Sequence, residues 1–97
     1  CNPPYIASAK VPVMAPEISL HEPRLAFDGG AFGLTIISRL LADAPRFLRS
    51  GGSLCFEVGA GNGGFWSERL KRNALYSSVR AVTDASGVAR VLVATVC

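Results

Sequence analysis

The stretch Val88-Ala89-Arg90-Val91-Leu92-Val93-Ala94-Thr95-Val96, close to the end of this 97-residue chain, decides which kind of fold can form. Its centre, residues 91–94, shows no alternation of apolar and polar residues. A strand of this kind is usually buried on both faces. We therefore expect residues 88–96 to form a central strand with a neighbouring strand on each side.

Two further strands are predicted before it. Asp84-Ala85-Ser86-Gly87 is typical of a tight turn in which Gly87 adopts positive φ, so residues 78–83 and 88–96 should form a hairpin. The apolar residues 53–58 follow two glycines and are too few for a helix, which predicts a strand in which Cys55 packs as a small hydrophobe. The predicted fold class is α/β, with three strands that end in an antiparallel hairpin.

Two helices complete the predicted elements. Residues 33–49 carry one apolar stripe with alternating three- and four-residue spacing, made by Leu34, Ile37, Leu41, Ala44 and Leu48. Pro45 should kink or restart this helix, and Gly51-Gly52 should end it. Residues 63–75 predict the second helix, and the side chains expected to pack inward from it are Phe65, Trp66, Leu70 and Ala74.

The composition is typical of one small globular domain over residues 1–97. Apolar residues make up 49% of the chain and charged residues 18%, and no apolar run approaches the roughly 20 residues of a membrane span. The net charge of +3 is mild, and the basic cluster Arg69, Lys71 and Arg72 is expected to be a solvated helix face rather than a nucleic-acid site. Residues 6–30 contain three prolines without periodicity and predict a long ordered loop, with Asp28 in a turn.

The cysteines and the histidine argue against a metal centre. Cys1, Cys55 and Cys97 are too few and too widely spaced for a disulfide framework or a zinc site. His21 is the sole histidine, which excludes a site with several histidine ligands. Reduced thiols are the simplest interpretation, and they favour a cytoplasmic protein.

The tetrapeptide Asn2-Pro3-Pro4-Tyr5 is the segment that most suggests chemistry. Two prolines beside an asparagine also form ordinary turns, so the tetrapeptide alone leaves both interpretations open. It resembles the catalytic motif of methyltransferases that alkylate planar nitrogens with S-adenosylmethionine. Adenine-N6 DNA methyltransferases and guanine-N2 RNA methyltransferases share this motif.

The residues that follow the tetrapeptide narrow the resemblance. The stretches that agree in order and spacing with the HemK/PrmC family are His21-Glu22-Pro23-Arg24-Leu25-Ala26-Phe27-Asp28-Gly29-Gly30, Gly33-Leu34, Arg49-Ser50-Gly51-Gly52-Ser53-Leu54, Phe56-Glu57-Val58-Gly59 and Asp84-Ala85-Ser86-Gly87 with Arg90. That family methylates the side-chain amide of a glutamine in peptide-chain release factors. The resemblance implies the C-terminal half of a class I, Rossmann-like methyltransferase domain, whose seventh strand lies antiparallel between the fifth and the sixth.

The resemblance also implies the roles of the site residues. An amide nitrogen is a poor nucleophile because its lone pair is delocalised into the carbonyl group. Asn2 would accept a hydrogen bond from the substrate NH₂ group through its side-chain oxygen, and Pro3 through its backbone carbonyl, which orients the nitrogen for attack. Pro4 completes the catalytic motif, Tyr5 would lie flat against the amide, and Asn2 would also contact the cofactor. Glu22 would contribute to substrate binding.

A glycine-rich loop, Glu57-Val58-Gly59-Ala60-Gly61-Asn62-Gly63-Gly64, fits two cofactor patterns. It matches the dinucleotide fingerprint and also the glycine motif that binds S-adenosylmethionine. The residues after Gly64 supply one helix and one hairpin, which is too little for the βαβ unit that such a cofactor needs, and Asp84 belongs to the predicted turn. We therefore predict a structural helix entry whose glycines let the helix pass close to the sheet.

The resemblance sets three expectations for the chain as a whole. The main S-adenosylmethionine site would lie upstream of Asn2, so the isolated chain should be inactive and bind this cofactor negligibly. The edge of the strand at residues 53–58 would be unpaired, which predicts a homo-oligomer or association with the N-terminal half. The release factor would be the partner of the full-length enzyme. The alternatives are a fragment of a nucleic-acid base methyltransferase, and a non-catalytic remnant that acts through oligomerisation.

Overall fold

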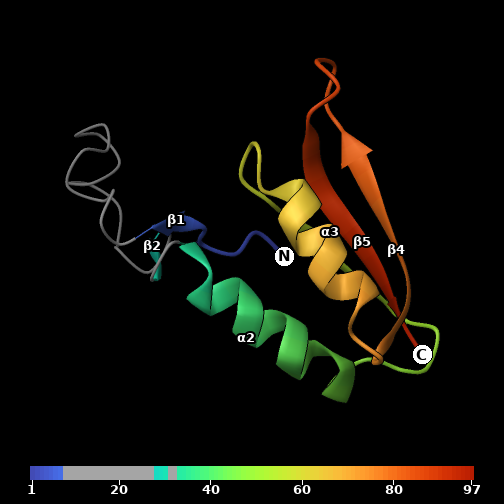
Figure 1. The fold of residues 1–97 in the computed structure, drawn as a ribbon. Coiled ribbons are helices and arrows are strands. Elements are labelled where there is room, and N and C mark those ends of the chain that lie inside the picture. The colour runs from blue at the N-terminus through green and yellow to red at the C-terminus, as the bar shows by residue number, and fades with distance from the viewer. Residues whose placement is uncertain (8–27, 31–32) are drawn as a thin grey trace. The chain divides into compact units, whose positions relative to one another are not determined.

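The computed structural model describes residues 1–7, 28–30 and 33–97 (Figure 1). The described chain divides into two compact units, one made of Cys1–Asn2 with Leu41–Cys97 and the other of Pro3–Leu40. The first unit contains a three-stranded sheet and the helix α3. The second contains two short strands and most of the helix α2.

The sheet of the first unit is built from β3 (Ser53–Glu57), β4 (Tyr76–Thr83) and β5 (Ala89–Val96). The strand order is β3-β5-β4, and both pairings are antiparallel. The last strand is therefore central, as its sequence predicts. The α/β fold class and the position of the last strand between its two neighbours are both confirmed.

The two faces of β5 differ, contrary to the prediction that both would be buried. Leu92, Ala94 and Val96 are buried, whereas Val91, Val93 and Thr95 on the other face are only half-buried. A Cβ at Gly63, the first residue of α3, would lie 3.8 Å from Cγ2 of Val58, which continues the buried face of β3. In the described chain α3 thus packs on one face of the sheet, and this is why an apolar strand has one half-open side.

The same asymmetry corrects the prediction for Cys55. In β3 the side chain of Phe56 is buried and that of Cys55 is exposed. Successive residues of a strand point to opposite faces of a sheet, so Cys55 lies on the face opposite α3. The prediction that this thiol packs as a small hydrophobe is wrong.

The helix α3 spans Gly63–Lys71, so it ends before the predicted limit, and Ala74 lies beyond it. Trp66 and Leu70 are both buried to 1% exposure, as predicted. Phe65 is 45% exposed, so the prediction that it packs inward is wrong. The reason is helical geometry: Phe65 is offset by about 100° from Trp66 around the helix, and only the side that carries Trp66 and Leu70 faces the sheet.

The hairpin turn between β4 and β5 forms as predicted. Gly87 has φ of +80°, and its N–H donates to the Asp84 carbonyl at 3.0 Å. The Asp84 side chain also accepts hydrogen bonds from the N–H groups of Ser86 and Val88, at 2.8 and 3.1 Å. Asp84 is therefore used by the turn, which agrees with the prediction that it is not a ribose-binding acid.

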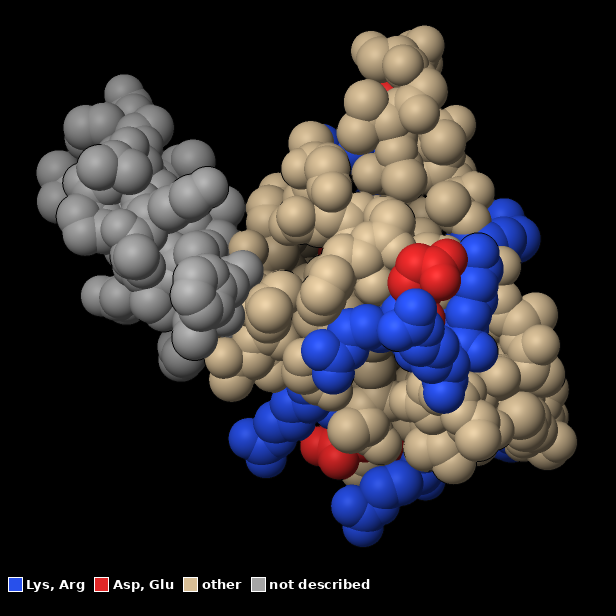
Figure 2. Space-filling model, in the orientation of Figure 1, with Lys and Arg blue, Asp and Glu red and all other residues tan. Residues whose placement is uncertain are grey.

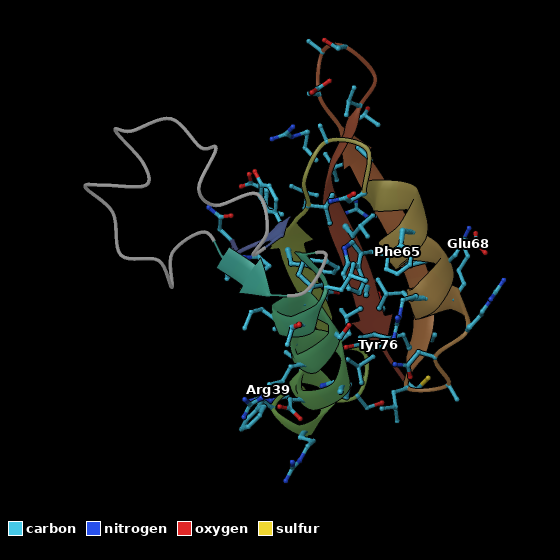
Figure 3. The ribbon with its side chains drawn as sticks, turned by 60° about the vertical axis from the view of Figure 1, so that its left-hand side comes forward. Arg39, Phe65, Glu68 and Tyr76 are labelled. Atoms are coloured by element: carbon cyan, nitrogen blue, oxygen red, sulfur yellow. The ribbon has the colours of Figure 1, made fainter. Side chains whose placement is uncertain are left out.

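The helix α2 spans Thr35–Asp43 and is shorter than predicted. It passes into a single 3₁₀ turn, η4 (Ala44–Arg46), where Pro45 occupies the start of the new helix. Proline cannot donate the hydrogen bond that a continuing α-helix requires, so the predicted restart at Pro45 is confirmed. The buried hydroxyl of Tyr76 in β4 donates to the Leu41 carbonyl at 2.7 Å, which ties the end of α2 to the sheet (Figure 3).

The second unit contains regular structure where an irregular loop was predicted. The strands β1 (Ile6–Ala7) and β2 (Asp28–Gly30) pair in parallel, so Asp28 lies in a strand and not in a turn. Strands of two and three residues are too short to leave a periodic signal in the sequence. The remainder of the predicted loop lies outside the described residues. Among the residues that are described, no helix is long and apolar enough to span a membrane.

Candidate functional site

Cys1 pairs with the edge of β3 that faces away from β5, so the prediction that this edge is unpaired is wrong beside Cys55 and Glu57. The N-terminal ammonium group of Cys1 donates to the Cys55 carbonyl at 2.8 Å, and the N–H of Glu57 donates to the Cys1 carbonyl at 2.9 Å. In a parallel pair of strands, one residue hydrogen-bonds to the two residues on either side of its partner. Cys1 bonds in this way to Cys55 and Glu57, so it is in register with Phe56. The pairing fixes the backbone immediately before Asn2 at the carboxyl end of β3.

The structure places the predicted catalytic residues in both units. Asn2 is exposed and belongs to the first unit, while Pro3, Pro4 and Tyr5 belong to the second. Pro3 is buried, and Pro4 and Tyr5 are half-buried. Glu22 and His21 lie outside the described residues. The roles predicted for Asn2, Pro3, Pro4, Tyr5 and Glu22 therefore remain predictions.

An ion pair that was not predicted lies at the same end of β3. A side-chain oxygen of Glu57 is 4.0 Å from a guanidinium nitrogen of Arg90, and both side chains are half-exposed. Such pairs contribute little to stability because water screens them. Glu57 and Arg90 both stand in stretches quoted for the family resemblance. In the register of the sheet Glu57 lies opposite Val91, so strand pairing alone would not have predicted its contact with Arg90.

Packing explains one glycine of the glycine-rich loop, and backbone conformation explains another. A Cβ placed on Gly63 would lie 2.7 Å from the Ala89 Cβ, so the space of its missing side chain is filled by β5. Gly61 has φ of +86°, which favours glycine, and a Cβ on Gly64 would meet nothing within 4 Å. The entry of α3 is thus pressed against the sheet, as predicted. The space beside Gly63 is occupied by the Ala89 side chain, so a cofactor could not use it.

Burial raises the pKa of the Tyr76 phenol, which lies at the far end of the sheet from Asn2. No group of three or more histidine, cysteine or acidic side chains that could hold a metal ion occurs in the described ranges.

Comparison with curated proteins gives consistent relatives. The chain is 46% identical over 92 residues to the release factor glutamine methyltransferase of Gloeobacter violaceus, which covers 95% of this chain. It is 39% identical over 93 residues to the enzyme of the same name from Thermosynechococcus vestitus. The chain is homologous to the release factor glutamine methyltransferases. The predicted resemblance to HemK/PrmC is confirmed, and with it the class I methyltransferase character of the fold.

The homology covers only part of each relative. The chain spans 32% of the length of both the Gloeobacter and the Thermosynechococcus proteins. A ribosomal protein uL3 glutamine methyltransferase from Bradyrhizobium diazoefficiens is 45% identical over 60 residues, or 62% of this chain and 18% of the relative. No protein-family profile matches the chain.

Proposed function

We propose that the chain is the C-terminal, substrate-side half of an S-adenosylmethionine-dependent methyltransferase that acts on a glutamine side chain of a peptide-chain release factor. The observation that carries this proposal is the 46% identity over 95% of the chain, together with the presence of Asn2-Pro3-Pro4-Tyr5. Residues 1–97 would then form part of one methyltransferase domain, in a cytoplasmic enzyme.

The chemistry that we propose centres on Asn2. S-adenosylmethionine supplies an electrophilic methyl group on a sulfonium centre. The Asn2 side-chain oxygen and the Pro3 carbonyl accept hydrogen bonds from the glutamine NH₂ group and hold its lone pair in line with that methyl group. Methyl transfer would form an N–C bond as the S–C bond breaks, the bonding electron pair would stay on sulfur, and the nitrogen would release one proton to water. No charged base is required, because orientation and placed dipoles supply most of the acceleration.

The backbone pairing of Cys1 supports the role of Asn2. Two hydrogen bonds to β3 hold the residue before Asn2, and the following proline restrains the backbone of Asn2 to an extended conformation. The Asn2 side chain is left exposed. An exposed amide on a fixed backbone is suited to orienting a substrate.

The cofactor site is proposed to lie mostly outside this chain, with Asn2 as its one contact here. The packing of Gly63 against Ala89 supports this view, because the glycine-rich loop offers no cradle at that position. The isolated chain should be inactive and should bind S-adenosylmethionine negligibly. Calorimetry that gives a micromolar dissociation constant for the isolated chain would overturn this part of the proposal.

We also propose that the edge of β3 associates with a second chain, either another copy or the N-terminal half. Cys1 covers the edge only beside Cys55 and Glu57, and no described backbone pairs with the edge at Ser53. Exposed edges of this kind recruit further strands. A stable monomer in sedimentation at high concentration would count against this association.

A chimera tests the proposed substrate. The matching segment of the Gloeobacter violaceus relative is replaced by residues 1–97, and transfer of a tritiated methyl group is measured to a release factor, to ribosomal protein uL3 and to RNA. We expect the release factor to be methylated. The uL3 relative favours ribosomal protein uL3 as the second candidate. Transfer to RNA alone would support the nucleic-acid alternative, and a well-folded chimera that is inactive on all three substrates would support the non-catalytic remnant.

A further inference from the structure

The outer face of α3 carries an aromatic and basic cluster made by Phe65 and Arg69. The ring of Phe65 is 45% exposed and meets the buried ring of Trp66 edge to face, with centroids 4.9 Å apart. The guanidinium carbon of Arg69 lies 5.7 Å from the Phe65 centroid and 5.8 Å from the Trp66 centroid. Figure 3 shows Phe65 and Glu68 projecting from this helix.

Arg69 has no acidic partner in the part of the chain that the structure describes. The neighbouring carboxylate of Glu68 is 3.3 Å from the ammonium group of Lys71 and is thereby paired. Arg72, at the end of α3, adds a further positive charge. Figure 2 shows basic side chains gathered over the region of α3 with an acidic side chain among them.

Packing accounts for only part of this arrangement. The guanidinium group of Arg69 lies against the ring of Trp66, which is buried to 1% exposure. This contact does not explain why a phenylalanine is exposed beside Trp66. Aromatic and arginine side chains are enriched in protein interfaces, and a guanidinium group already held against two rings loses less conformational entropy on binding.

We propose that Phe65 and Arg69 form a docking surface for an acidic segment of a protein. A carboxylate of the partner pairs with the exposed edge of the Arg69 guanidinium, and a neighbouring apolar side chain covers the Phe65 ring. The charges favour a protein over a nucleic acid. Beyond the Lys71–Glu68 pair, α3 and its cap offer only Arg69 and Arg72, whereas strands of nucleic acid are held by longer tracks of cations and several exposed rings.

The test is a titration of the ¹⁵N-labelled 97-residue chain with the blocked peptide Glu-Glu-Leu-Glu-Glu, followed by amide chemical shifts. We expect the largest shifts between Phe65 and Arg72. Arg69→Gln should weaken binding by up to roughly fivefold, because it removes one exposed charged contact. Phe65→Ser should also weaken binding, because it removes the ring that the apolar side chain of the peptide covers. Arg69→Lys should weaken binding less than Arg69→Gln but measurably, because lysine keeps the charge and loses the planar stacking.

Arg46→Gln is the matched control, because it removes an exposed arginine from η4 and leaves α3 intact. It should leave peptide binding unchanged. An equal loss of binding in Arg46→Gln and Arg69→Gln would overturn the proposal, since attraction would then depend on net charge alone. Shifts absent from α3, or a pentauridylate that binds α3 as tightly as the peptide, would also overturn it. The readout is independent of methyl transfer, so it can fail without any consequence for the proposed function.

Discussion

Two segments adjoin the carboxyl end of β3, and they are used in opposite ways. The glycine-rich loop that follows β3 matches the glycine pattern of cofactor-binding loops. The space beside its Gly63, however, is occupied by the Ala89 side chain. The segment Cys1-Asn2 is held by two backbone hydrogen bonds, and the Asn2 side chain is left exposed. The difference teaches that a motif is a candidate site only when packing leaves its functional groups unused.

The packing role of the glycine-rich loop depends first on the helix that it begins. Trp66→Ala removes the largest fully buried side chain and should destabilise the chain by about 3–5 kcal/mol. Phe65→Ala one position earlier is the control and should cost much less, because that ring is half exposed. Urea unfolding followed by circular dichroism measures both. Equal losses would show that α3 is not anchored through Trp66.

Gly63→Ala tests the close approach itself. The added Cβ would lie 2.7 Å from the Ala89 Cβ, so the helix or the strand must shift, and we expect a loss of about 1–3 kcal/mol. Gly64→Ala adds the same atom to the next residue of α3, where nothing lies within 4 Å. It should stabilise the helix by up to about 1 kcal/mol. A Gly63→Ala variant with an unchanged free energy of unfolding would show that the space beside Gly63 is open, and the loop would again be a candidate cofactor site.

The link between α2 and the sheet should depend on pH. Burial raises the pKa of Tyr76 above its ordinary value of about 10. At a pH between the unfolded-state and the folded-state pKa, the folded chain therefore keeps a phenol proton that the unfolded chain has lost. The contribution of Tyr76 to stability is therefore complete below pH 10 and declines as the pH rises through the folded-state pKa. Tyr76→Phe should cost about 1 kcal/mol at pH 7 through the lost hydrogen bond to Leu41. It should also flatten the alkaline decline in unfolding free energy, and an unchanged slope would contradict the assignment to Tyr76.

Asn2→Ala should have the smallest effect on stability. The side chain is exposed and the hydrogen bonds of the segment come from the Cys1 backbone, so the free energy of unfolding should change by less than about 0.5 kcal/mol. Thermal unfolding of the two chains measures the difference. A loss of several kcal/mol would mean that the Asn2 side chain has a structural role. It would contradict the claim that packing leaves this side chain unused.

The sequence predicts the architecture of the sheet because its signals are local. The apolar run of β5, the turn at Asp84 and the restart at Pro45 each depend on a few adjacent residues, and all three are confirmed. The exposure of Cys55 and Phe65 was mispredicted because it depends on which sheet face and which helix side have a neighbour. The short pair β1 and β2 carries no periodicity. The pairing of Cys1 with β3 could not be predicted from residue types either, since it uses only backbone groups.

The most direct test of the central claim is methyl transfer by the Gloeobacter violaceus chimera that carries residues 1–97, measured with and without Asn2→Ala. We predict transfer to the glutamine side chain of a release factor. We predict that Asn2→Ala lowers kcat by at least about 100-fold, the usual effect of removing one placed hydrogen-bonding group, with unchanged thermal stability. A folded chimera that keeps its full rate after Asn2→Ala would contradict the claim that Asn2 orients the substrate amide.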